Sequence, residues 1–132
     1  MTPLSRWPLS KSEEDRIKEV LSSELTEVAD KKKMVSLLKS LLTESEYLMV
    51  AKRLMAFVLI DEGYVDVKIA KILHVTRATA NRFRLVYKYA KEKDEPVVEL
   101  VNKVRLSYEL KEVLKKVLFK YALPAALGRI PR

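Results

Sequence analysis

The stretch that decides the fold is DVKIAKILHVTRATANRFRL, residues 66–85. Apolar residues recur at helical spacing on both sides of a short turn around His74, which predicts two consecutive helices. The small Ala70 suits the crossing point of the two helices, and His is among the residue types that tolerate a left-handed turn conformation. The spacing therefore predicts a helix-turn-helix unit. Its expected inward positions are Ile69, Leu73, Val75, Ala80 and Phe83.

The run around this unit is strongly basic. Between residues 68 and 91 there is no Asp or Glu, and residues 63–93 hold eight basic and two acidic side chains, a net charge of +6. Residues 1–62 carry −1 and residues 94–132 carry +3. Because basic side chains beside such a helix can neutralise phosphates, the pattern predicts double-stranded DNA as the partner. The basic residues of the run are Lys68, Lys71, Arg77, Arg82, Arg84, Lys88 and Lys91.

The second helix, residues 77–91, is expected to lie in a major groove. Arginine matches the O6/N7 edge of guanine, asparagine matches adenine, and an alanine methyl can meet the thymine methyl. The expected base-reading residues are Arg77, Ala78, Asn81 and Arg82. The expected phosphate contacts, which set register rather than sequence, are Lys68, Lys71, Thr76, Arg84 and Lys88. An ordinary exposed helix with a solvated basic face is the plainer alternative.

The rest of the chain is expected to be helical. Ser12 and Asp15 resemble a capping box that starts a helix, and Thr43-Glu-Ser-Glu46 opens another that Gly63 ends. We expect Asp66 and Thr76 to cap the two helices of the motif. The expected helices outside the motif span 12–29, 33–42, 44–62 and 96–121, the last with Pro96 in its first turn. The expected organisation is a flexible arm 1–11, a helical core or dimer scaffold 12–42, a DNA-binding region 43–93, a C-terminal helix 94–121 and an irregular tail 122–132.

Composition predicts an all-α fold and argues against a membrane protein or an enzyme. Among 132 residues there are two glycines and no cysteine, and no segment alternates with period two over enough residues for a strand. The longest apolar run, residues 54–60, is far shorter than the roughly 20 residues of a membrane span, so we expect a cytoplasmic protein. The expected DNA binding would associate it with the nucleoid. With its one histidine in a turn and no thiol or Gly-rich loop, the chain is not expected to be an enzyme or to hold a metal or cofactor.

Residues 41–88 resemble the Trp repressor family. The resemblance rests on LLTESEYLMVAKRL and on IDEGYVDVKIAKILHVTRATANRF, which share that family's leucine-threonine-acid opening, E-G turn and I-A-K…V-T-x-A-T-x-x-R run. It implies an intertwined, all-helical homodimer that reads a palindromic operator and acts as a transcriptional repressor. The wide apolar stripes on the flanking helices agree with a dimer, because one small domain could not cover them.

The resemblance also suggests an effector pocket. Thr43, Arg53, Thr79 and Arg82 match positions that line the family's tryptophan site. Two positions depart from the pattern. Phe83 replaces a glycine that leaves room for the indole, and Val86 replaces a serine that helps to hold the ligand's amino group. Both departures argue against tryptophan as a corepressor. Phe83 would fill the space of the indole, and Val86 would leave the buried ammonium of the ligand without a partner.

Two other classes of protein stay open. A module resembling region 4 of a sigma factor would also join a capped helix to a helix-turn-helix, and it would bind promoter DNA as a monomer. A helical protein-interaction module without nucleic acid is the other, although it would have little need for an acid-free run around one helix. The oligomeric state distinguishes the sigma-like monomer from a dimeric regulator. Charge reversal at Arg77 and Arg82 would abolish DNA binding by a regulator but would not impair partner binding by an interaction module.

Overall fold

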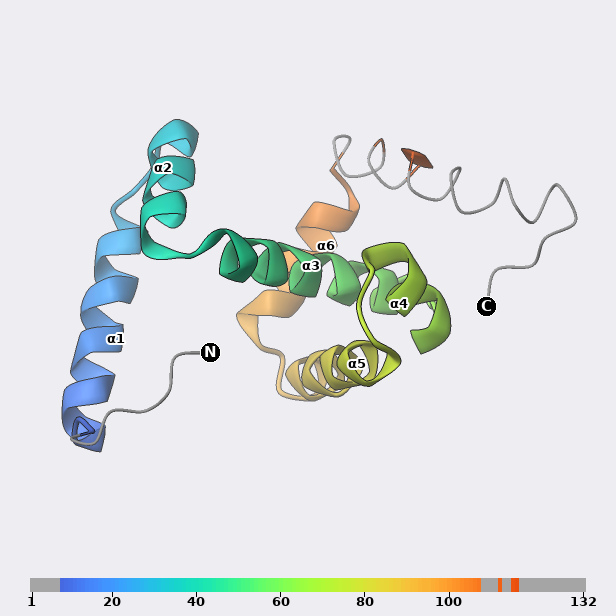
Figure 1. Cartoon of the computed structure of the whole chain (residues 1–132), viewed down its shortest axis with the longest axis horizontal. Helices are drawn as coiled ribbons and strands as arrows, with labels where there is room; N and C mark the ends of the chain where they lie inside the picture. Colours follow the sequence, from blue (N-terminus) through green and yellow to red (C-terminus); the bar gives the residue numbers. More distant parts are fainter. Residues whose placement is uncertain (1–7, 108–111, 113–114, 117–132) are drawn as a thin grey trace, which may run out of the picture. The chain divides into compact units, whose positions relative to one another are not determined.

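The structure is a computed structural model that describes residues 8–107, 112, 115 and 116 (Figure 1). The elements in this part of the chain are α1 (Lys11–Thr26), α2 (Lys31–Leu41), α3 (Glu44–Asp61), α4 (Asp66–Leu73), α5 (Arg77–Glu92) and α6 (Pro96–Arg105). No strand occurs among the described residues, so the predicted all-α class is confirmed there. The chain divides into two compact units, residues 1–47 and 48–132.

Helix α1 begins earlier than the sequence predicted. Ser10 is the N-cap: its hydroxyl accepts from the backbone N–H of Glu13 at 3.2 Å, and the Glu13 carboxylate accepts from the Ser10 N–H at 2.9 Å. The predicted start at Ser12 is therefore wrong, because the same pattern of serine and acid occurs two residues earlier. The part of the predicted arm at 1–7 lies outside the described residues.

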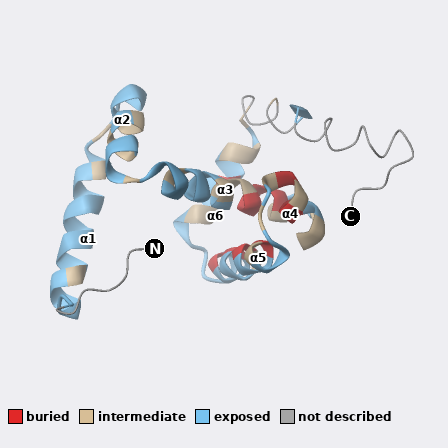
Figure 2. Ribbon diagram, viewed as in Figure 1, coloured by how far each residue is buried: buried red, intermediate tan, exposed pale blue. Residues whose placement is uncertain are grey.

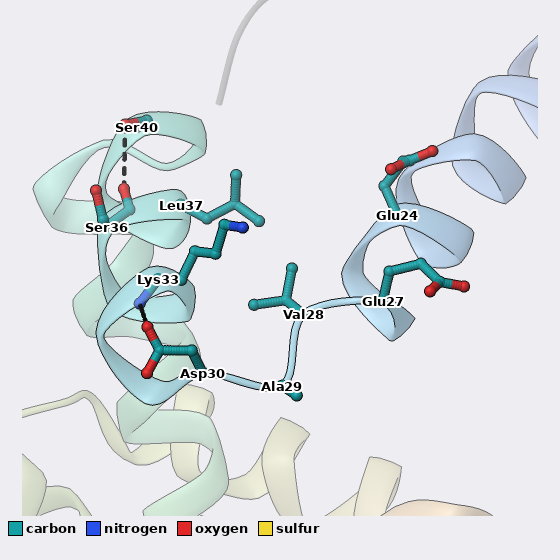
Figure 3. Close-up of a pocket in the computed structure, with 9 residues that line it drawn as sticks. All are labelled: Glu24, Glu27, Val28, Ala29, Asp30, Lys33, Ser36, Leu37 and Ser40. Atoms are coloured by element: carbon teal, nitrogen blue, oxygen red, sulfur yellow. Dashed lines mark hydrogen bonds between the residues drawn. The ribbon is translucent and has the colours of Figure 1, made fainter.

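Helix α2 is capped by Asp30, whose carboxylate accepts from the backbone N–H of Lys33 at 3.2 Å. No residue of α1 or α2 is buried, and Ile17 on α1 is 58% exposed. Val28 and Leu37 extend into a hollow between these two helices (Figure 3). The apolar stripe of α1 therefore remains available for a further contact.

The hydrophobic core lies in the second unit, where α4, α5 and α6 pack around the second half of α3 (Figure 2). The apolar run at 54–60 is buried from Ala56 to Leu59 and partly buried at its ends. Ring contacts join α3 to α5, with the Phe57 and Tyr87 rings stacked at 5.2 Å.

Local signals at the ends of α3 also behave as predicted. The Thr43 hydroxyl accepts from the Glu46 N–H at 3.1 Å, and the Glu46 carboxylate accepts from the Thr43 N–H at 2.8 Å. Gly63 follows the helix with φ of 94°, a conformation that favours glycine. It lets the N–H of Tyr64 reach the carbonyl of Leu59 at 3.0 Å.

Helix α6 starts at Pro96 as predicted and ends at Arg105, so a single helix over 96–121 is wrong. Leu106 caps it, and the N–H of Ser107 donates to the carbonyl of Val104 in a closing turn. The apolar periodicity continues across this break without Gly or Pro, which explains the overextended prediction. Residues 108–111, 113–114 and 117–132, including the predicted tail 122–132, lie outside the described residues.

Candidate nucleic-acid interface

The turn between α4 and α5 has the predicted local geometry. His74 ends α4 with φ of 54° and ψ of 52°, the left-handed conformation, and the N–H of Val75 donates to the carbonyl of Ala70 at 3.0 Å. The chain can therefore turn sharply between the two helices within three residues. Thr76 then caps α5 as predicted, because its hydroxyl accepts from the N–H of Thr79 at 3.0 Å.

The predicted inward positions of the helix-turn-helix are buried or partly buried, and Ile72, Tyr87 and Ala90 are buried as well. Ile69 and Ala80 are fully buried, and Ala70 and Phe83 are 7% and 6% exposed. Leu73 and Val75 are partly buried against the same core. The opposite face of α5 is open to solvent, as Figure 2 shows. The exposed residues at its N-terminal end are Thr76, Arg77, Ala78, Asn81, Arg82 and Leu85.

The four expected base-reading residues lie together on this exposed face. Arg77 and Ala78 occupy the first turn of α5. The Asn81 amide donates to Asp66 at 3.1 Å, and the Arg82 guanidinium donates to the Thr79 hydroxyl at 3.4 Å. Exposed contacts of this kind can exchange for contacts with a ligand.

Asp66 joins α4 to α5 and does not cap α4. The N-cap is Val65, without a side-chain hydrogen bond, so the predicted cap is wrong. The Asp66 carboxylate instead accepts from Arg84 Nε at 2.6 Å, while Arg84 Nη2 donates to the carbonyl of Tyr64 at 2.5 Å. Hydrogen bonds from Arg84 and Asn81 hold the pKa of Asp66 below its ordinary value. Arg84 therefore already contacts Asp66 and Tyr64 within the chain, although the sequence predicted that it would contact a DNA phosphate.

A second carboxylate, that of Asp61 at the end of α3, accepts hydrogen bonds from side chains of α5 and α6. It accepts from the Tyr87 hydroxyl at 3.0 Å, from Lys91 Nζ at 3.3 Å and from Arg105. Burial raises the pKa of Asp61, but these three hydrogen bonds outweigh burial and leave the pKa below its ordinary value. Burial, followed by the contact with Asp61, raises the pKa of Tyr87 to about 12.

Sequence reasoning missed both carboxylates as partners of the basic run. Asp66 and Arg84 are 18 residues apart, and Asp61 and Lys91 are 30 apart, on different helices in each case. Helical periodicity carries no information about such pairs. The arrangement neutralises two of the seven basic side chains that the sequence assigned to the run.

The other five basic side chains of the run form no ion pair with any described residue. They are Lys68, Lys71, Arg77, Arg82 and Lys88. A further cation comes from α3, where Lys52 Nζ lies 3.4 Å from the carbonyl of His74. Lys52 therefore adds positive charge at the turn, and only the fold could reveal its position.

A hollow of about 360 Å³ opens beside this face. Three of the four residues expected at an effector pocket line it, whereas Thr43 does not and serves as the cap of α3. The Arg53 guanidinium lies 5.7 Å from the centre of the Phe83 ring, which packs edge-on against Phe57. The residues that line this hollow are Met49, Arg53, Thr79, Arg82, Phe83 and Val86.

Among the described residues, no group of three or more His, Cys, Asp or Glu side chains is placed to hold a metal ion. In the same part of the chain, no helix combines the length and apolarity that crossing a bilayer requires. Comparisons of the chain with protein-family models, with curated proteins and with solved structures find no match.

Proposed function

We propose that this protein is a sequence-specific DNA-binding transcriptional regulator and that α5 enters the major groove. The observation that carries the proposal is the two-sided character of α5. One side packs into the core through Ala80, Phe83 and Tyr87, while the other presents Arg77 and Arg82 to solvent. A helix fixed in this way can place side chains on base edges without losing much conformational freedom.

The chemistry of the exposed residues suits a duplex. Arg77 and Asn81 are one helical turn apart, so they can reach neighbouring base pairs, with Ala78 between them. Lys68, Lys71, Thr76 and Lys88 remain the proposed phosphate contacts. Arg84 takes a different role in this proposal: through Asp66 it positions α4 against α5.

We further propose that the regulator is a homodimer. Exposed apolar side chains are numerous on α1 and on the first half of α3, and a second copy of the chain could bury them. The group consists of Ile17, Val20, Leu21, Leu48, Met49 and Val50. A two-fold dimer would present two α5 helices to successive major grooves about 34 Å apart, and occupancy of a promoter would then cause repression.

Selection of the full chain against a random duplex library, without added ligand, tests this proposal. A two-fold symmetric consensus is the expected result, and it would also show that no corepressor is required. An asymmetric consensus would instead favour a monomer of the sigma region 4 type. Salt-sensitive binding without sequence preference, or no binding, would overturn sequence-specific regulation.

A matched pair of variants links the result to α5. Arg77→Ala removes an unpaired side chain of the exposed face, and Lys103→Ala removes an exposed cation from α6. The first should alter the consensus at one position, whereas the second should leave the consensus unchanged.

A further inference from the structure

Helix α2 carries a second basic surface, far from the helix-turn-helix in sequence. Its sequence, KKKMVSLLKSL, holds four lysines and no acid, within a 62-residue segment whose net charge is −1. All four lysines are exposed. Three of them, together with Val35 and Ser36, line a hollow of about 510 Å³, and this set defines the α2 lysine face: Lys31, Lys32, Val35, Ser36 and Lys39.

The lysines of this face are unpaired in the described part of the chain, where no carboxylate comes within ion-pair distance of a lysine ammonium of α2. The nearby acids of α1 do not compensate them. Glu24 and Glu27, the C-cap of α1, line the hollow between α1 and α2, and their carboxylates point away from Lys33, the α2 lysine that lines this hollow rather than the lysine face (Figure 3). The charge of the face is therefore available to a partner.

The placement of these lysines is unfavourable for the helix itself. The first turn of α2 holds Lys31, Lys32 and Lys33, although the helix dipole favours negative charge at this end of a helix. The first turn of α1, by contrast, holds Glu13 and Glu14. The Asp30 cap offsets part of this cost. Three lysines beside it still break a local rule, and natural sequences tend to break such rules at functional sites.

The spacing of the face fits a regular array of anions. Lys31 and Lys39 are eight residues apart, about 12 Å along the helix axis. One strand of a duplex presents a phosphate roughly every 3.4 Å of its axis, so the face can meet about three phosphates. Lysine is a flexible point charge that suits phosphates, and it is depleted from the cores of protein interfaces. The Ser36 hydroxyl, which faces the same hollow, can donate to a phosphate oxygen.

We infer that the α2 lysine face is a second, sequence-independent contact with the phosphate backbone of duplex DNA. The inference rests on the proposed function, because it assigns the same partner to a separate part of the chain. Contacts of this kind raise affinity for all sequences and increase the dependence of binding on salt, whereas the α5 face supplies the sequence preference.

The experiment measures the affinity of the full chain for two duplexes, the selected sequence and an unrelated one of equal length, over a range of salt concentrations. The variant Lys31→Gln/Lys32→Gln/Lys39→Gln should flatten the slope of log K against log salt by about 2 to 3 for both duplexes. The preference for the selected duplex should be unchanged. Arg16→Gln/Lys18→Gln/Lys103→Gln removes the same total charge from other exposed positions and should flatten the slope by less than about 1.

Two further measurements keep the result interpretable. Lys31→Arg/Lys32→Arg/Lys39→Arg should retain the wild-type slope, and far-UV circular dichroism should show equal helix content in all variants. A wild-type slope in the glutamine variant of α2 would overturn the inference, and a simultaneous change in sedimentation would assign the face to a contact between copies.

The failure of this inference differs from the failure of the proposed function. An unchanged slope with an intact sequence preference would remove only the role of α2. A wild-type protein without sequence preference would remove the proposed regulator, but a flattened slope on the unrelated duplex would still support the lysine face. Absence of all duplex binding would overturn both.

Discussion

Tyr87→Phe tests the buried hydrogen bond between α5 and the end of α3. Tyr87 is 1% exposed, and its hydroxyl donates to Asp61 at 3.0 Å. Phenylalanine keeps the ring stacked on Phe57 and removes only the hydroxyl. A hydrogen bond to a charged group stabilises a fold by about 1.5–3 kcal/mol. Because Asp61 keeps Lys91 and Arg105 as donors, we expect a smaller loss of about 1–2 kcal/mol at pH 7.

The dependence on pH gives a sharper test of the same contact. The pKa of Tyr87 is raised from 10.0 to about 12 in the folded protein, first by burial and then by the neighbouring Asp61. The fold therefore favours the neutral phenol, and this stabilisation is complete below pH 10 and is lost as pH rises to about 12. At pH 11 the wild type should lose about 1.4 kcal/mol relative to the phenylalanine variant, which has no group to ionise there.

Urea unfolding followed by circular dichroism at pH 7, 9 and 11 measures both effects. The difference in unfolding free energy between wild type and Tyr87→Phe should be nearly constant from pH 7 to 9 and close to zero at pH 11. Tyr89→Phe is the matched control on the same helix, since Tyr89 is 59% exposed and has Lys93 over its ring. An equal difference at pH 7 and pH 11, or the same behaviour in the Tyr89 variant, would refute the reasoning.

Four further variants test other parts of the structure. Arg77→Ala should cost about 1–3 kcal/mol of binding to the selected duplex and relax preference at one base pair; an equal loss on every sequence, measured by competition, would contradict base reading. Lys88→Gln should weaken binding to all duplexes and reduce the salt slope by about 0.9 in titrations at several salt concentrations; a change in consensus would oppose that role. Gly63→Ala should lower the unfolding free energy by about 1–2 kcal/mol, because φ is 94° and no atom lies within 4 Å of the added Cβ to complicate the strain; urea unfolding without a change would exclude strain. Asp66→Ala should cost about 1–2 kcal/mol at pH 7 through the lost contact with Arg84. Because the pKa of Asp66 is lowered in the folded protein, this difference should begin to shrink as pH falls below the ordinary value of 3.8, so unfolding should show a smaller difference at pH 3 than at pH 7.

Short-range patterns predicted most of the caps and turns between residues 43 and 77. The capping box at Thr43, the turn glycine Gly63, the left-handed His74 and the cap Thr76 all depend on residues within a few positions of one another. The inward face of α4 and α5 followed from helical periodicity for the same reason. Errors arose where the local pattern was ambiguous, as at Ser10 and Ser12, which both precede acids.

The candidate site was less predictable because its electrostatics depend on contacts between helices. Asp66 has the sequence signature of a cap, yet its carboxylate binds Arg84 on the next helix. Lys52 lies outside the basic run and still approaches the turn at His74. Proximity along the chain could not reveal either contact, since both require the packed arrangement of α3, α4 and α5.

Charge summed along the sequence therefore differs from charge that is free to bind. Residues 63–93 have a net charge of +6, a sum that already counts Asp66, the partner of Arg84. Lys91 is paired in addition with Asp61, which lies outside that segment. Residues 1–62 have a net charge of −1, but the lysines of α2 are unpaired among the described residues. A polyanion responds to local, unpaired charge within a Debye length of about 8–10 Å rather than to segment totals. For this reason the segment that appears electrostatically neutral in sequence carries the additional surface that we assign to DNA.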